Sequence, residues 1–174
     1  MENSCSLFEQ MIRELSSQCY YEPVCQEVLD RIGLLKENVF IPKIATRGSA
    51  GADFFAPEDI RLAPGDEIRV ATGIKAHCHP FTRLSIVPKS GLGFKYYTRL
   101  ANTVGTVDAD YYGNPENDGC IFVKLRNEGQ KELLIRRGEA FCQGIFEPYI
   151  PDRDYFNEDH KARSGGFGST NAKA

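Results

Sequence analysis

The first 35 residues carry an apolar stripe at helical spacing that occurs twice. Apolar side chains recur at i, i+1, i+4, i+5 and i+8 over Leu7–Leu15, and the same stripe returns seventeen positions later over Val24–Ile32. This spacing places them on one face of an amphipathic helix. We therefore expect residues 1–35 to form a helical N-terminal extension, a hairpin of two short helices that adds to the core of a larger unit. Docking of a partner on this hairpin stays open as its other role.

Residues at the ends of these stripes predict where the two helices begin and end. Ser6, with Glu9 three residues later, can form a capping box at the start of the first helix. Pro23 suits the first position of the second helix, and Gly33 suits its C-terminal stop.

From residue 36 to about residue 150 the hydrophobic period changes from helical to two. Short runs alternate apolar and polar residues, and turn signals over residues 64–66, 127–129 and 137–139 separate them. The alternating apolar positions are Ile68 and Val70, Leu84 and Ile86, Ile121, Val123 and Leu125, and Leu133 and Ile135. Many short strands without intervening helices are typical of an antiparallel sandwich or barrel. We expect an all-β core domain over residues 36–150.

Residues 151–174 are polar and rich in glycine near the end. A stretch with so few apolar side chains cannot form a core, so it is either a frayed tail or an arm that orders on a ligand. Its glycine amides and hydroxyl groups could surround a phosphate, while Arg163 adds positive charge and Phe167 offers a face for a base.

Length and charge narrow the function class. The chain has 174 residues, 41% of them hydrophobic and 26% charged, which fits one soluble globular domain with an appendage. A net charge of −3 and a pI near 5.7 argue against a protein that coats duplex DNA. The longest apolar runs are too short to span a membrane, and charged residues interrupt the start where a secretory signal would need an apolar segment. We expect a cytoplasmic protein without nucleic-acid or membrane partners.

The six cysteines show no zinc-type spacing, so we expect reduced thiols that pack mostly as small apolar residues. His77 and His79 would share one face of a strand and could chelate a metal. No third and fourth ligand is evident, so the rim of a strand that ends at Pro80 is the favoured interpretation.

Four internal segments hold more polar or glycine residues than strands need. In residues 49–54 Asp53 stands among small residues, and residues 88–93, with Lys89, are either a phosphate-binding turn or a simple loop. In residues 102–113 Gly105 suggests the tip of a β-turn, and Asp108 and Asp110 would face the same way if the chain were extended there. Such a pair can hold water or Mg²⁺, and one carboxylate can act as a general base, although a D-x-D sequence taken by itself is more often an exposed turn. The fourth segment, residues 138–143, ends in Gln143, whose amide could donate to a phosphate, although a glutamine on a strand face is the commoner explanation.

Together with the C-terminal arm, these segments resemble, in order, the five motifs of the homotrimeric dUTPases. The match covers roughly residues 38–171. The resemblance implies a distorted jelly-roll β-barrel with three copies around a threefold axis. It also implies that residues 151–174 are a flexible C-terminal arm that closes over a site built by neighbouring subunits.

The resemblance further implies a reaction, the hydrolysis of dUTP to dUMP and pyrophosphate with Mg²⁺. This reaction limits uracil incorporation into DNA and supplies dUMP for dTMP synthesis. Asp108 corresponds to the carboxylate that activates the water attacking the α-phosphorus, and Tyr111 to the ring that leaves no room for a 2′-hydroxyl. Asn102 and the adjoining backbone of Val104 and Gly105 correspond to the hairpin that reads uracil.

The remaining site residues follow from the same resemblance. Asp53 corresponds to a carboxylate that supports the metal through water, and Phe167 to the aromatic that covers uracil. Phosphate-contacting positions correspond to Lys89, Ser90, Gly91 and Gln143, and the arm groups around the γ-phosphate to Arg163, Gly168, Ser169 and Thr170.

The chain departs from the family pattern at a few positions. Lys89 stands where arginine is common, which replaces a bidentate fork by a point charge, and Asn171 replaces a closing glycine of the arm. Residues 114–119 look like an extension after the third motif, and the two-helix front is not part of the minimal fold.

Two other functions are weighed against dUTP hydrolysis. A dCTP deaminase, alone or with dUTPase activity, would need a catalytic glutamate at the site, where this chain has Asp108. A non-enzymatic β-sandwich oligomer that acts as a regulatory binding protein would leave the convergence of base, phosphate donors and aromatic lid without a role.

Overall fold

The computed structural model describes residues 2–157 and residue 165. Within this part of the chain the helices are α1 (Glu2–Ser17), α2 (Gln26–Ile32) and α3 (Ser90–Tyr96), and the short 3-10 turns are η1 (Lys36–Asn38) and η2 (Ala109–Tyr111). The strands are β1 (Tyr20–Pro23), β2 (Lys43–Ile44), β3 (Ala52–Phe55), β4 (Ile60–Leu62), β5 (Glu67–Ala71), β6 (Ile74–His77), β7 (Thr82–Pro88), β8 (Thr98–Leu100), β9 (Gly105–Val107), β10 (Phe122–Asn127), β11 (Leu133–Ile135) and β12 (Ala140–Pro148). The prediction of an all-β core is confirmed.

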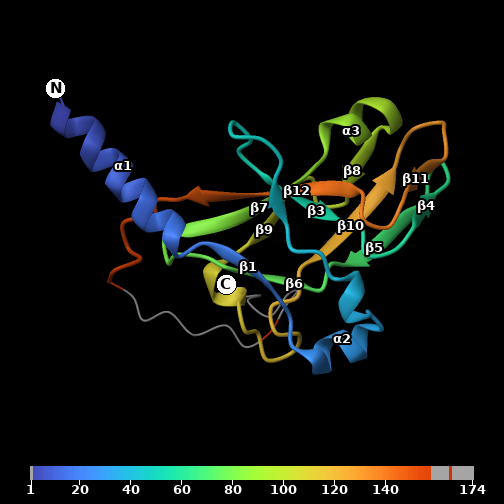
Figure 1. Cartoon of the computed structure of the whole chain (residues 1–174), viewed down its shortest axis with the longest axis horizontal. Coiled ribbons are helices and arrows are strands. Elements are labelled where there is room, and N and C mark those ends of the chain that lie inside the picture. Colours follow the sequence, from blue (N-terminus) through green and yellow to red (C-terminus); the bar gives the residue numbers. More distant parts are fainter. Residues whose placement is uncertain (1, 158–164, 166–174) are drawn as a thin grey trace.

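The strands form antiparallel sheets that enclose one main core (Figure 1). The largest sheet has the order β2-β3-β12-β7-β9, and a second has the order β5-β10-β8. Two further strand pairs, β1 with β6 and β4 with β11, complete the set among the described residues. Hydrogen bonding does not close these sheets into a barrel, and the jelly-roll-like arrangement that we expected is otherwise present.

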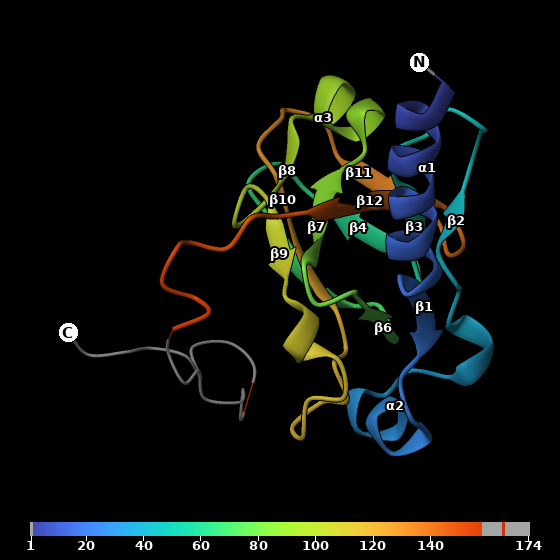
Figure 2. The ribbon, with the colours of Figure 1, turned by 90° about the vertical axis from the view of Figure 1, so that its left-hand side faces the viewer.

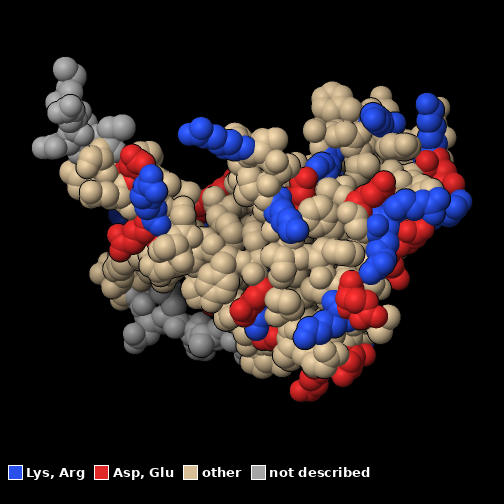
Figure 3. Space-filling view, viewed as in Figure 1, with Lys and Arg blue, Asp and Glu red and all other residues tan. Residues whose placement is uncertain are grey.

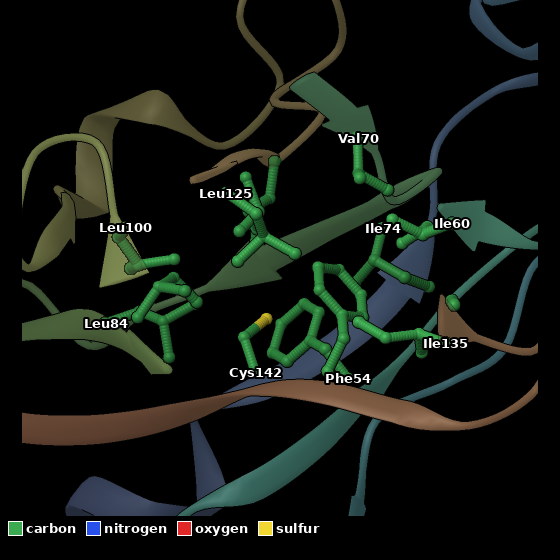
Figure 4. Packing of buried hydrophobic residues seen from close by; sticks show 14 of the residues in the cluster. Phe54, Ile60, Val70, Ile74, Leu84, Leu100, Leu125, Ile135 and Cys142 are labelled. Atoms are coloured by element: carbon green, nitrogen blue, oxygen red, sulfur yellow. The ribbon is translucent and has the colours of Figure 1, made fainter. Parts of the chain in front are cut away.

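Alternation along the strands explains how the core forms. In β10 the side chains alternate between buried and exposed, and Val123 and Leu125 point inward. Figure 4 shows residues from both large sheets meeting in the centre, among them Phe54 of β3, Leu84 of β7 and Leu125 of β10. Burial of these apolar surfaces is the main stabilising contribution to the fold.

The N-terminal extension differs from the predicted helical hairpin. α1 begins at Glu2, so Ser6 lies inside the helix and the predicted capping box is wrong. Between the helices the chain forms β1, which pairs with β6 in the register Tyr21 opposite Ala76. Pro23 is the last residue of this strand, and Cys25 is the N-cap of α2. Gly33 ends α2 in the left-handed conformation with φ 71°, as predicted.

Of the two N-terminal helices, α2 and not α1 places buried residues in a core. Val28 and Leu29 of α2 are buried in a small cluster with Val24 and Cys120. By contrast, α1 projects from the body (Figures 1 and 2), and Leu7 and Phe8 are 68% and 63% exposed. The last turns of α1 border a groove of about 460 Å³ that is also lined by β3 and β12. The expectation that both stripes extend the core is therefore wrong for α1.

Charged side chains of the two signs are interspersed on the face of the molecule seen in Figure 3. Several pair across neighbouring strands, as do Lys124 with Glu67 at 2.5 Å and Arg61 with Glu132 at 3.0 Å. These pairs are exposed and each adds little stability. No broad patch of one sign lies on this face, so an anionic ligand bound there would depend on local donors. No described helix combines the length and apolar character needed to cross a bilayer.

Cysteine side chains contribute to the core as free thiols. Cys78, Cys120 and Cys142 are buried, whereas Cys25 is exposed. Burial raises the pKa of Cys78 to about 12 and that of Cys120 to about 11, from the usual 9.0, and it also raises the pKa of Cys142. These thiols therefore stay protonated and unreactive near neutral pH.

We expect the free energy of unfolding to fall as the pH rises above about 9. In the unfolded chain these thiols ionise near their ordinary pKa of 9.0, whereas the folded chain holds their protons up to the raised values. The contribution of these thiols to the free energy of unfolding is complete below about pH 9 and is lost as the pH approaches about 11 to 12. Urea midpoints under reducing conditions at about pH 7.5 and about pH 10 measure the effect. Cys120→Ala should weaken the pH dependence and Cys25→Ser should not; equal behaviour of both variants would contradict the assignment.

Candidate active site

Three of the predicted segments meet on adjacent strands of the large sheet. In β12, Gln143 lies opposite Asp53 of β3 on one side and Val87 of β7 on the other. Lys89 follows Val87 by two residues and so belongs to the same face. Its Nζ donates to Asp53 Oδ2 at 2.7 Å. The first, second and fourth segments therefore form one polar cluster, which contains a cation, a carboxylate and an amide.

The first segment lies close to this amide because it contains a glycine. A Cβ added at Gly51 would lie 3.2 Å from Gln143 Oε1 and 3.0 Å from Ile145 Cγ1. Contacts that short leave little room for any side chain at residue 51. Gly51 thus lets the backbone of the first segment approach β12 next to the cluster.

The second segment is a helix start and not the simple loop or turn that we expected. Lys89 is the N-cap of α3, and Ser90 and Gly91 form the first turn of the helix. The backbone N–H groups of a first turn have no partners within their own helix, so they are available to other acceptors. The three residues expected to contact phosphate thus follow one another where β7 ends.

The hairpin of the third segment reverses at Asn102 and Thr103, which precede the predicted tip at Gly105 by three and two residues. After β8 the chain turns at Asn102 and Thr103, and Thr103 takes the left-handed conformation with φ 66°. Gly105 is the first residue of β9 and lies opposite Ile86 of β7, so it is not the tip of the turn. A Cβ at Gly105 would lie 3.2 Å from Ile86 Cβ. The glycine therefore permits close packing of β9 on β7.

Asp108 and Asp110 do not continue an extended strand. Asp108 has extended backbone angles, φ −78° and ψ 157°, but the 3-10 turn η2 follows at once. The alternation that would place both carboxylates on one face is therefore broken. Both are exposed and near Tyr149, whose pKa is raised by burial and further by the nearby negative groups, these two carboxylates included.

Asp108 lies far from the polar cluster of Asp53, Lys89 and Gln143. In the pairing of β7 with β9, Leu84 is opposite Val107 and Ile86 is opposite Gly105. Continued by one residue, this register places Asp108 opposite Arg83 near the start of β7. Lys89 lies just after the end of the same strand. Six residue steps along the sheet separate them, or about 20 Å at the rise of an extended strand.

Tyr111 is buried, with 9% of its surface exposed, and its hydroxyl is held from two sides. The hydroxyl donates to the carbonyl oxygen of Cys120 at 3.0 Å and accepts from Asn117 Nδ2 at 2.8 Å. Tyr111 was predicted from the sequence as a site residue, whereas Asn117, which lies in the 114–119 extension, was not. The local signal in that extension was the Asn-x-Gly sequence at residues 117–119, which is typical of a turn.

Several predicted groups lie outside the described residues. They are the arm positions Arg163, Phe167, Gly168, Ser169, Thr170 and Asn171.

The chain that follows β12 packs against the segment that precedes β7. The Tyr149 N–H donates to the Phe81 carbonyl at 3.0 Å, and the rings of Phe81 and Tyr155 are 6.2 Å apart.

The two histidines serve the local structure. β6 ends at His77 and not at the predicted Pro80, so His77 lies at the rim of the strand and His79 lies beyond it. The His77 ring stacks on Tyr20 at 4.9 Å. His77 Nδ1 lies 2.7 Å from the Gln18 carbonyl, and His79 Nδ1 accepts from the Phe81 N–H. Residues 2–157 contain no group of three or more His, Cys, Asp or Glu side chains arranged to hold a metal ion.

A family model described as dUTPase matches residues 37–171. The deoxyuridine 5′-triphosphate nucleotidohydrolase of Lactococcus lactis subsp. lactis (strain IL1403) is 39% identical over 135 residues, which are 78% of this chain and 90% of that one. The enzyme of the same name from Escherichia coli O9:H4 (strain HS) is 38% identical over 134 residues, 74% of this chain and 85% of that one.

Solved structures show the same likeness. The dUTPase from Streptococcus mutans superposes with a TM-score of 0.64 at 30% identity, covering 76% of this chain and 98% of that one. A mutant dUTPase from phage phi11 of S. aureus, in which a structural Mg(II) ion is coordinated, superposes with a TM-score of 0.59. It covers 77% of this chain and 93% of that one, and at 15% identity it supports the fold alone.

Proposed function

The chain belongs to the dUTPase family and hydrolyses dUTP to dUMP and pyrophosphate, and we propose that Asp108 activates the attacking water. The exposed carboxylate of Asp108 accepts a proton from the water while the water oxygen attacks the α-phosphorus in line. The bond from the α-phosphorus to the bridging oxygen breaks, and pyrophosphate leaves. The proposal is supported by one observation: Asp53, Lys89 and Gln143, from three segments of the chain, meet in one polar cluster, and Asp108 directly follows the hairpin strand β9 with an exposed carboxylate.

Lys89, the first turn of α3 and Gln143 bind the phosphates in this proposal. The ammonium of Lys89 is already oriented by Asp53, and the amides of Ser90 and Gly91 add neutral donors. Donors fixed before the substrate arrives stabilise developing charge without reorganisation. The acidic overall charge of the chain does not oppose this, because these contacts are local.

The hairpin and Tyr111 select the nucleoside. The tip at Asn102, with the backbone of Val104 and Gly105, presents donors and acceptors that can pair with the edge of uracil. The ring of Tyr111 is fixed by its hydroxyl and leaves no room for a 2′-hydroxyl. Residues of the arm, with Phe167 over the base, would complete the enclosure and exclude bulk water.

Mg²⁺ fits the chemistry of the cluster as an ion held mainly by the triphosphate. Asp53 Oδ2 is engaged by Lys89, so Oδ1 is the oxygen left to bond a metal-bound water. Mg²⁺ usually keeps several waters and binds through one or two carboxylates and substrate phosphates. When bound, the ion would neutralise charge on the phosphate oxygens.

We further propose that the working enzyme is a homotrimer. A single nucleotide needs the phosphate cluster and Asp108 within the length of its triphosphate, but one chain separates them by about 20 Å along the sheet. Neighbouring copies, each contributing one of these parts, resolve the separation. Residues 36–150 then form the core domain, and residues 151–174 act as the arm on a neighbour's site. The free thiols of the protein suit the reducing interior of a cell, where hydrolysis would deplete dUTP and supply dUMP.

Incubation of the purified protein with dUTP and Mg²⁺ tests the proposal. We expect dUMP and pyrophosphate from dUTP, with little turnover of UTP, dTTP or dCTP under the same conditions. Ammonia release from dCTP would instead indicate a deaminase. No turnover of any nucleotide would overturn the assignment and favour a binding role.

A further inference from the structure

Residues 114–119 form a loop that folds back on Tyr111. The Asn114 N–H donates to the Tyr111 carbonyl at 3.2 Å, and the Asp118 N–H donates to the Asn114 carbonyl at 2.7 Å. Gly119 then comes so close that a Cβ on it would lie 2.7 Å from the Tyr111 carbonyl oxygen. The loop therefore packs directly on the backbone of the tyrosine that we place under the sugar.

The amide of Asn117 joins this loop to the tyrosine side chain. Its Oδ1 accepts the Gly119 N–H at 3.0 Å, while its Nδ2 donates to the Tyr111 hydroxyl at 2.8 Å. The first bond requires the oxygen on one side, so it fixes the orientation of the amide and leaves the nitrogen toward Tyr111. With the Cys120 carbonyl on its other side, the hydroxyl is held at two points.

The N-terminal part of the chain anchors the loop in turn. Lys75 of β6 bonds both carboxylate oxygens of Asp118 at 3.0 Å, and these two side chains are only 13% and 19% exposed. Asp118 also accepts the Cys25 N–H at 2.7 Å, and Arg31 of α2 donates to the Glu116 carbonyl at 2.6 Å. The loop is thus fixed to the protein body and can transmit that rigidity to Tyr111.

We infer that Asn117 is a positioning residue for sugar selection, because it holds Tyr111 where the ring excludes a 2′-hydroxyl. The inference rests on the proposed sugar role of Tyr111. Rejection of a ribonucleotide by shape depends on a ring that cannot move aside, and small displacements at a reacting site have large effects. Loss of the Asn117 amide frees the hydroxyl on one side and lets the ring tilt.

The test compares the selectivity ratio, which is kcat/KM for dUTP divided by kcat/KM for UTP. In Asn117→Ala this ratio should fall about tenfold or more. Asn117→Asp keeps an acceptor for the Gly119 N–H and so preserves the turn, but its carboxylate can only accept. The Tyr111 hydroxyl has one proton, so it cannot donate to this carboxylate and to the Cys120 carbonyl at once, and one of its two bonds is lost. Asn117→Asp should also lower the ratio, and it serves if the alanine variant does not fold.

Asn127 provides a matched control elsewhere in the fold. It is fully buried, its Oδ1 accepts the Gly129 N–H at 3.0 Å, and its Nδ2 donates to the carbonyls of Leu62 and Lys131. Asn127→Ala therefore removes an equivalent turn bond at the end of β10, whereas the Cys120 carbonyl that holds Tyr111 lies before the start of that strand. It should lower the melting temperature while the selectivity ratio stays unchanged. An equal fall of the ratio in both variants would mean general loosening and would overturn the inference.

Variants of Tyr111 separate the inference from the proposed function. Tyr111→Phe should lower the ratio as Asn117→Ala does, and the double variant should lose no more than either single one. If Tyr111→Ala loses discrimination while both Asn117 variants keep it, the role of Asn117 is wrong and that of Tyr111 stands. If Tyr111→Ala keeps discrimination, the proposed sugar contact itself is wrong, and the inference falls with it.

Discussion

Asp108→Asn is expected to lower kcat for dUTP by about a hundredfold or more, because an amide cannot accept the proton of the attacking water. Asp108 is exposed and directly precedes η2, so an isosteric amide should leave the fold intact. Steady-state measurement of pyrophosphate release gives kcat. Binding of a non-hydrolysable dUTP analogue, measured by calorimetry, should change little.

Asp110→Asn is the matched control for this prediction. It removes the same charge two residues away, from a side chain that is also exposed and also near Tyr149. We expect a much smaller effect on kcat. Near-normal turnover in Asp108→Asn, or equal losses in both variants, would contradict the assignment of Asp108 as the general base.

The strands of the core could be predicted because alternation reports burial directly. Leu84 and Ile86 of β7, and Val123 and Leu125 of β10, are buried as their spacing indicated. The β1 strand could not be predicted in the same way. It is only four residues long, and its partner β6 lies more than fifty positions further along the chain. Such a pairing depends on tertiary context that local propensity does not contain.

Helix ends proved less predictable for a similar reason. Ser6 and Glu9 have the spacing of a capping box, but the residues before Ser6 also join the helix. The apolar stripe of α1 predicted a helix correctly and its burial wrongly, because periodicity does not say what covers a face. α3 was missed since its two glycines favour a loop, although it forms a helical start at the end of β7.

The candidate site was predictable mainly through the order of its motifs. Asp53, Lys89 and Gln143 are each ordinary alone, and only the register of β3, β12 and β7 shows that they meet. The distance from Lys89 to Asp108 follows from the pairing of β7 with β9, which no motif contains. Asn117 escaped notice because its role depends on how its loop closes on Tyr111.

The separation between Lys89 and Asp108 leads to the second large effect, which is recovery of activity in mixed oligomers. Lys89→Ala removes the proposed charged phosphate donor and Asp108→Asn removes the proposed base, so each variant alone should be nearly inactive. Co-expression of differently tagged chains, followed by two-step purification, yields oligomers that contain both. In some of their sites the intact Lys89 of one chain meets the intact Asp108 of another.

The size of the recovery can be anticipated from random assembly at equal amounts. A site built from two chains works when the first carries only the Asp108 change and the second only the Lys89 change, which holds for about a quarter of the sites in a closed symmetric ring. We therefore expect close to a quarter of the wild-type kcat before enrichment by the tags. The measurement is pyrophosphate release per chain.

Asp53→Ala mixed with Lys89→Ala provides the contrasting case. Asp53 and Lys89 are bonded within one chain at 2.7 Å, so they belong to the same half of a site. No chain in that mixture has both intact, and activity should stay at the level of the separate variants. A site contained within a single chain would give no recovery in either mixture, because every chain would then lack one group that its own site needs. Recovery in the first mixture alone therefore requires two chains at each site.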